Sequence, residues 1–152
     1  MSKRIMLALL LGGAGVLAVS AARADETVTP KQLKWTQPPN LPKGVQVAIV
    51  QGKPNESGPY IYEVKYPANY KVAPHSHSDS RTYVVVSGTL YIGEGEKFDQ
   101  ASLKALPAGS VLTYTAGTKH FAASKQPVTF VVSGTGPSEL TYVNPSDNPQ
   151  KK

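Results

Sequence analysis

The 152-residue chain carries a formal net charge of +6 and contains three histidines but no cysteine. The absence of cysteine excludes disulfides, thiolate metal sites and cysteine nucleophiles. The lysines are scattered, without a basic run or a basic helix, so the charge does not predict nucleic-acid binding.

Residues 1–24 have the organisation of a cleavable secretory signal. Two basic residues near the N-terminus precede an apolar run, and Ala22-Arg23-Ala24 supplies an A-x-A cleavage site. The apolar run is short for a membrane span, and no second run of spanning length follows. We therefore expect a periplasmic or secreted protein, cleaved after Ala24, with no membrane attachment.

The next segment, residues 25–44, is rich in proline and lysine and predicts an extended arm lying on the domain, with Trp35 as its anchor. Strand patterns then recur at short intervals. They predict strands over residues 45–50, 60–66, 71–77, 81–86, 89–93, 110–115, 119–124, 128–133 and 139–143.

Alternation within residues 60–66 places Tyr60, Tyr62, Val64 and Tyr66 on one face, as core or pocket wall. Two other segments break the strand pattern. A short helical excursion is predicted near residues 97–105, and the polar tail at 146–152 is expected to be disordered. The chain therefore predicts one all-β domain at residues 45–145, built as a sandwich or barrel.

The three histidines have the spacing of a metal site. His75 and His77 form an H-x-H pair on a predicted strand, which directs both imidazoles to one face. His120 comes from a distant strand of the same predicted domain. Three imidazole nitrogens suit a divalent transition metal, and the sequence does not distinguish among Zn, Fe, Cu, Ni and Mn.

These residues resemble the two sequence motifs of the cupin superfamily, and the resemblance extends over about residues 44–148. The chain is similar to small, single-domain, exported bacterial cupins. The resemblance implies a double-stranded β-helix, or jelly-roll barrel, with the three histidines as metal ligands. The intervals match at His75-Ser-His77 and Gly88, and at Gly109, Gly117 and His120.

The chain departs from the cupin motifs at four positions. Asn69, Thr115 and Ser124 replace a Gly, a Pro and an Asn at loops and strand ends. Arg81 stands where the motif has a metal-binding Glu. This departure changes the charge of the site, because a guanidinium cannot lose its charge by deprotonation.

Three arrangements could accommodate a fixed positive charge beside a metal. An anionic substrate could bridge Arg81 and the metal. A nearby carboxylate, Glu63 or Asp79, could instead pair with Arg81 permanently. Alternatively, the site could bind no metal, leaving a structural cupin with an empty barrel.

Cupins include oxygenases and isomerases. The resemblance therefore implies a metal-dependent enzyme of this type, acting on a small anionic molecule. The alternative is a non-catalytic periplasmic module that binds or senses a metal or small ligand. Cupin domains of some anti-sigma factors are similar and bind zinc, but nothing here matches a sigma-binding helical domain. Exposed edge strands, and the dimers common among cupins, lead us to expect a homodimer.

Overall fold

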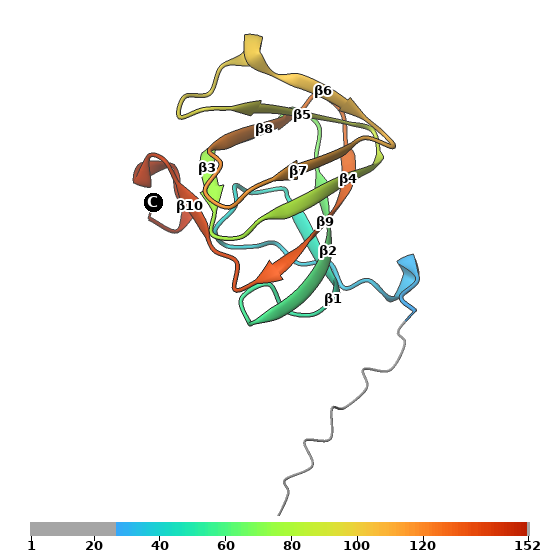
Figure 1. The fold of residues 1–152 in the computed structure, drawn as a ribbon. Coiled ribbons are helices and arrows are strands. Elements are labelled where there is room, and N and C mark those ends of the chain that lie inside the picture. The colour runs from blue at the N-terminus through green and yellow to red at the C-terminus, as the bar shows by residue number, and fades with distance from the viewer. Residues whose placement is uncertain (1–26, 152) are drawn as a thin grey trace, which may run out of the picture.

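The computed structural model describes residues 27–151, so the predicted signal at residues 1–24 lies outside the described residues. Within this range, ten strands form two five-stranded sheets with antiparallel pairing (Figure 1). The first sheet has the order β1 (Gln46–Gln51), β2 (Gly58–Tyr66), β9 (Val128–Gly136), β4 (Arg81–Ser87) and β7 (Val111–Tyr114). The second has the order β10 (Leu140–Tyr142), β3 (Tyr70–His77), β8 (His120–Ser124), β5 (Thr89–Glu94) and β6 (Lys104–Pro107).

The two sheets enclose one core, and the predicted all-β jelly roll is confirmed. Alternate side chains of each strand point between the sheets, as period-two geometry requires. In β2 these are the four residues that the sequence places on one face, and Tyr60, Val64 and Tyr66 are buried there. The core also includes Leu90, Phe130 and Val132 from strands of both sheets.

The segment between β5 and β7 contains one predicted element and one that sequence reasoning missed. The helical excursion is the 3-10 turn η2 (Gln100–Ser102), in which the Asp99 side chain accepts a hydrogen bond from the Ala101 backbone N–H at 2.9 Å. The missed element is β6, an edge strand that pairs with β5. It is four residues long and mostly exposed, so it has too few buried positions to give an alternating pattern.

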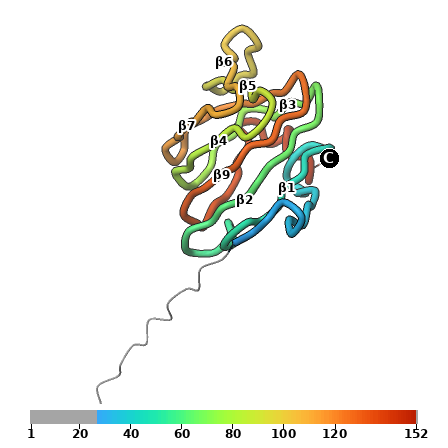
Figure 2. The backbone as a smooth tube through the Cα atoms, turned by 90° about the vertical axis from the view of Figure 1, so that its right-hand side faces the viewer, coloured from blue at the N-terminus to red at the C-terminus, as the bar shows by residue number. Residues whose placement is uncertain are grey.

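The arm runs along the first sheet before it turns toward the interior. After the 3-10 turn η1 (Pro30–Gln32), Thr36 forms an antiparallel bridge with Val47 of the edge strand β1. The Lys65 ammonium lies 3.8 Å from the centre of the Trp35 ring, a cation–π contact on the outside of β2. In Figure 2 the arm is the blue segment beside β1.

The C-terminal residues form two 3-10 turns, η3 (Pro145–Asp147) and η4 (Pro149–Lys151), within the tail that the sequence predicts to be disordered. Asn144 and Asn148 precede these turns, and their side chains accept hydrogen bonds from the backbone two residues later. Such capping by asparagine before proline favours a local turn without any buried side chain. No helix among residues 27–151 has the length and apolar character needed to cross a membrane.

Gly134 occupies a position of β9 where a side chain has no room. It pairs with Tyr60 on one side and with Arg81 on the other. A Cβ atom here would lie 2.5 Å from the Tyr60 hydroxyl and 2.7 Å from Asp79 Oδ2. The missing side chain therefore leaves space for the hydrogen bond between Tyr60 and Asp79.

We expect Gly134→Ala to lower the free energy of unfolding by about 2 kcal/mol, because overpacking displaces this buried contact. Urea unfolding followed by circular dichroism measures the change. Thr135→Ala, at the exposed neighbouring position, is the control and should change stability by less than about 0.5 kcal/mol. Equal stability of the two variants would contradict the prediction.

Candidate metal centre

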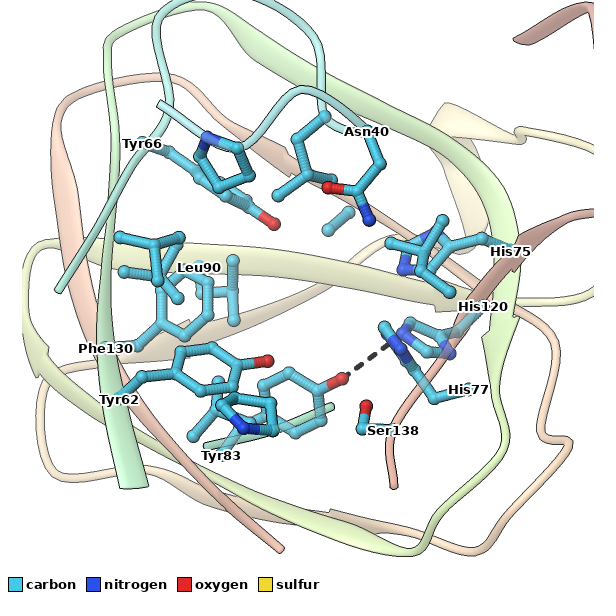
Figure 3. Close-up of a pocket in the computed structure, with 18 of the residues that line it drawn as sticks. Asn40, Tyr62, Tyr66, His75, His77, Tyr83, Leu90, His120, Phe130 and Ser138 are labelled. Carbon is cyan, nitrogen blue, oxygen red and sulfur yellow. Dashed lines mark hydrogen bonds between the residues drawn. The ribbon is translucent and has the colours of Figure 1, made fainter. Parts of the chain in front are cut away.

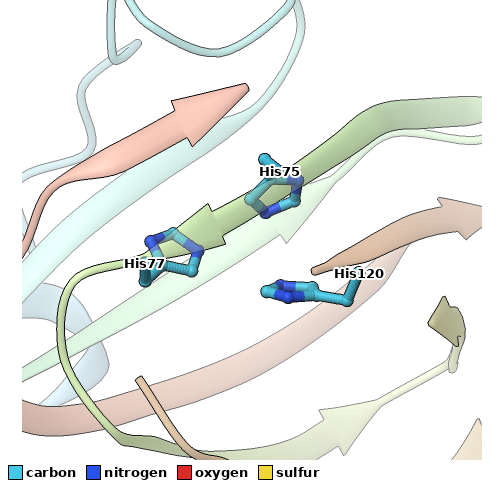
Figure 4. Close-up of side chains that lie close together, drawn as sticks. All are labelled: His75, His77 and His120. Atoms are coloured by element: carbon cyan, nitrogen blue, oxygen red, sulfur yellow. The ribbon is translucent and has the colours of Figure 1, made fainter. Parts of the chain in front are cut away.

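The structure brings the three predicted histidines together. His75, His77 and His120 each offer one ligand nitrogen, and these atoms lie within 4.8 Å of one another. The ring centres are 4.4 Å apart for His75 and His120, and 5.1 Å apart for His75 and His77. Figure 4 shows His75 and His77 on β3, facing His120 at the start of β8. Three nitrogens at this spacing can bind one metal ion after small side-chain rotations.

A β-bulge in β3 gives the histidines their inward direction. Val72 pairs with Ala122 of β8, but three residues later His75 pairs with His120, so the register shifts by one residue. Before the shift, even-numbered residues of β3 face the core; after it, the odd-numbered histidines do. Bulges redirect side chains in this way near functional sites. The H-x-H spacing predicts that two imidazoles share a face, but the bulge decides which face it is.

Backbone carbonyls orient the imidazoles. Nδ1–H of His75 donates to the Ala73 carbonyl at 2.8 Å, and Nδ1–H of His120 donates to the Thr118 carbonyl at 3.0 Å. Because a carbonyl only accepts, Nδ1 carries the proton in both rings, and Nε2 keeps its lone pair. Such contacts fix the tautomer and orientation of metal-binding histidines.

Burial keeps the imidazoles neutral. It lowers the pKa of His75 to about 3 and also lowers the pKa of His77 and His120. The positive charge of Arg81 lowers all three further. Metal ions bind the neutral form of histidine, so the site does not require the imidazoles to lose a proton at neutral pH.

Arg81 is buried beside the site and is paired with a carboxylate. Its Nη2 lies 2.5 Å from Oδ1 of Asp79, and both side chains are almost fully buried. Nη2 also donates to Ser138, and Tyr60 donates to the other oxygen of Asp79. Burial raises the pKa of Asp79, but the hydrogen bonds from Tyr60 and Arg81 bring it below its ordinary value.

Of the three arrangements considered for Arg81, the structure has the permanent ion pair, and its carboxylate is Asp79 rather than Glu63. The guanidinium does not line the cavity described below. Direct binding of an anionic substrate by Arg81 stays a prediction.

A cavity of about 220 Å³ lies between the sheets, and the histidines form one end of it (Figure 3). Tyr62, Tyr66 and Tyr83 approach from the first sheet, and most of the remaining wall is apolar. None of the lining residues in the described part of the chain is acidic. The volume is below the range of about 300–1,000 Å³ typical of ligand pockets, so the cavity fits a small molecule.

Sequence reasoning missed two parts of this cavity. Tyr83 lines it and contacts His120 Nε2 at 3.4 Å. Alternation from Arg81 along β4 was the signal that could have found it. The arm supplies the second part, because Asn40 and Leu41 also line the cavity. Nothing in the sequence of the arm indicates that it turns inward here.

The sequence of residues 23–137 matches the ChrR cupin-like domain family. The chain belongs to this family. No match was found among functionally curated proteins. The cupin motifs at the histidines therefore agree with a family match that covers most of the chain.

Solved structures have the same fold. A polyketide cyclase from Streptomyces resistomycificus superposes with a TM-score of 0.69 at 17% identity, over 84% of this chain and 92% of its own. A putative acetylacetone dioxygenase from Methylibium petroleiphilum superposes with a TM-score of 0.65 at 22% identity, over 86% of this chain and 89% of its own. A sugar phosphate isomerase from Silicibacter pomeroyi superposes with a TM-score of 0.60 at 17% identity, over 77% of this chain and 81% of its own. At these identities the likeness establishes the cupin fold of this chain and no activity.

We expect the metal-free protein to lose stability between pH 6.5 and pH 5. The ordinary pKa of histidine is about 6.5, so the unfolded chain takes up protons in this range. The folded chain does not, because burial lowers the pKa of His75 to about 3. Stability is therefore present above pH 6.5 and falls with pH, by roughly 1.5 kcal/mol per buried histidine at pH 5.

Urea unfolding at several pH values, with chelator present, measures this loss. His75→Gln removes one titrating group, so the loss of stability at pH 5 should be smaller by roughly 1.5 kcal/mol. Stability that stays constant from pH 6.5 to pH 5 would contradict the neutral, buried state of the histidines.

Proposed function

We propose that this cupin is an exported, metal-dependent enzyme of the oxygenase or isomerase type, acting on a small anionic molecule. One observation carries the proposal: three neutral imidazoles meet at the end of a small, mostly apolar cavity without an acidic residue. The histidines would hold a divalent transition metal and leave its remaining coordination positions facing the cavity. Such a metal acts as a Lewis acid or activates a bound molecule.

The charge of the site favours an anion. Three neutral imidazoles do not reduce the charge of a divalent ion, and no carboxylate lines the cavity. The charges of Arg81 and Asp79 neutralise each other beside the site, so the pair does not change the charge of the divalent ion. A negatively charged ligand would therefore be stabilised inside the cavity by an attraction that water screens poorly there.

The residues around the cavity support binding and orientation of a small substrate. Leu41, Leu90 and Phe130 contribute apolar wall and exclude water. The hydroxyls of Tyr62 and Tyr83 come from the sheet opposite the histidines (Figure 3). They can hydrogen-bond to the oxygen atoms of a molecule held between the two sheets.

The alternative is a non-catalytic module that binds or senses a metal or small ligand. It is favoured by the lack of an evident general base, since burial raises the pKa of Tyr62 and Tyr83 and lowers that of the histidines. No side chain with a shifted pKa in the cavity wall is therefore suited to act as a general acid or base at neutral pH. A binding module needs neither.

Metal binding is tested by elemental analysis of residues 25–152 purified from the native compartment, followed by calorimetry with Zn²⁺, Fe²⁺, Cu²⁺, Ni²⁺ and Mn²⁺. We expect one metal per chain and a melting temperature that falls when chelator removes it, because a ligand of the folded state stabilises it. At a metal concentration 100 times the Kd, that stabilisation is about 2.7 kcal/mol.

His75→Ala should lower metal affinity at least about 100-fold, whereas Ser76→Ala, which changes the residue between the two β3 histidines, should leave it unchanged. Full metal affinity in His75→Ala would contradict the shared site. An unchanged melting temperature with chelator would instead favour a structural cupin with an empty barrel.

Catalysis is tested by incubating the metal-loaded protein in air with a panel of small carboxylates and thiols. Oxygen uptake or a rearranged product that is lost in His120→Ala would support the enzyme. Metal binding without oxygen uptake or product, whichever of the five metals is bound, would favour the binding module.

Export is tested separately, by N-terminal sequencing of the protein from the native periplasm. We expect the chain to begin at Asp25, since the A-x-A site ends at Ala24. A chain that retains residues 1–24 would contradict cleavage.

A further inference from the structure

We infer that Tyr62 donates a hydrogen bond to the anionic oxygen of the ligand in the cavity. Arg81 is the positioning residue that orients the Tyr62 hydroxyl for this bond. The inference rests on the proposed metal-dependent function and deepens it. It gives Arg81 a role in ligand binding that does not require the guanidinium to touch the ligand. It also narrows the ligand to a small, mostly apolar organic molecule that carries an oxyanion.

The direction of the Tyr62 hydrogen bond follows from the chemistry of its neighbour. Nη1 of Arg81 donates to the Tyr62 hydroxyl oxygen at 3.1 Å. A guanidinium has only donors, so Arg81 cannot accept the phenol proton. That proton must point elsewhere, and the Tyr62 hydroxyl faces the cavity on the side where His77 and Ser138 lie (Figure 3).

The guanidinium is held too firmly to move into the cavity itself. Asp79 and Ser138 both bind Nη2, and the Arg81 side chain is about 2% exposed. Its Nε is buried without a hydrogen-bond partner, a cost that an apolar side chain of similar length would not carry. Arg81 therefore keeps its contact with Tyr62 in a fixed geometry, and Asp79 balances its charge.

Of the two other tyrosines of the cavity, Tyr66 differs from Tyr62 in its distance from the guanidinium, whereas Tyr83 also interacts with Arg81. The Tyr83 hydroxyl lies 3.4 Å from Nε2 of His120, the nitrogen that would bind the metal, so Tyr83 lies beside the metal position and is not used as the control. Tyr66 lines the same cavity on β2, four residues after Tyr62, and has no hydrogen bond from a guanidinium among the described residues. Tyr66 is therefore a matched control for the loss of a hydroxyl in this cavity.

The donor and the lining together define the ligand class. A neutral phenol whose oxygen already accepts from a guanidinium is a stronger donor, and a hydrogen bond to a charged oxygen is worth about 1.5–3 kcal/mol. The rest of the wall is mainly apolar and the volume is about 220 Å³. A small carboxylate, hydroxamate or enolate has the required oxyanion and size.

The test uses acetohydroxamate as the probe and the full mature chain loaded with Zn²⁺. Calorimetry measures the affinity for Zn²⁺ first and then for acetohydroxamate. We expect Tyr62→Phe to weaken acetohydroxamate binding at least about tenfold while its affinity for Zn²⁺ stays within about twofold of wild type. Tyr66→Phe should weaken acetohydroxamate binding less than about threefold.

The positioning role of Arg81 is tested by Arg81→Lys, alone and combined with Tyr62→Phe. We expect Arg81→Lys to weaken acetohydroxamate binding in the wild-type background and to add no further loss in the Tyr62→Phe background. A merely structural role would give the same loss in both backgrounds. If Arg81→Lys does not fold, the comparison of Tyr62→Phe with Tyr66→Phe still decides whether Tyr62 is the donor.

The outcomes separate this inference from the proposed function. Wild-type protein that takes up no metal would overturn both. Wild-type protein that binds Zn²⁺ but not acetohydroxamate, or Tyr62→Phe that binds it as well as Tyr66→Phe does, would overturn the inference alone.

Discussion

The buried ion pair between Arg81 and Asp79 connects most of the segments that form the site. Arg81 lies on β4 and Asp79 in the turn before it, and their hydrogen bonds reach Tyr60 and Tyr62 on β2 and Ser138 in the β9–β10 loop. Breaking such a pair by removing one partner costs about 3–5 kcal/mol, because the other charge stays buried. The position of β2 relative to the histidine end of β3 therefore depends on this pair.

The ion pair also explains how this cupin accommodates a change of charge at a motif position. A glutamate there would supply a negative ligand to a metal, whereas Arg81 brings a positive charge to the same region. Asp79, two residues earlier, cancels that charge at short range. The site is thereby left with three neutral imidazoles, and a bound divalent ion would keep its full charge toward the cavity.

Much of the fold and the histidine site could be predicted, because both depend on local periodicity. Alternation along residues 60–66 identifies the inward face of β2, and H-x-H spacing identifies two imidazoles on one face. The bulge between Val72 and His75 could not be predicted, since it depends on pairing with β8. Asn69 replaces a motif glycine without disrupting the fold because asparagine tolerates its left-handed conformation, with a φ of 57°.

The partner of Arg81 was one of two alternatives left by the sequence, because a carboxylate in a turn has no periodicity to fix its direction. The contribution of the arm was harder still to foresee. Asn40 and Leu41 reach the cavity through contacts with residues distant in the sequence, among them the hydrogen bond from Tyr142 to the Asn40 carbonyl. Contacts of this kind follow from the closed fold and leave no pattern in the segment itself.

The arm has a consequence for the kinetics of any ligand. Pro38, Asn40 and Leu41 form part of the cavity wall but belong to neither sheet. The Tyr142 hydroxyl donates to the Asn40 carbonyl, and the Tyr70 hydroxyl donates to the carbonyl of Pro42, directly after this segment. Two such bonds, each worth about 1 kcal/mol, resist displacement far less than a strand inside a sheet does. A molecule enclosed here would have a residence time that depends on how often this segment opens, separately from how tightly the histidine end binds it.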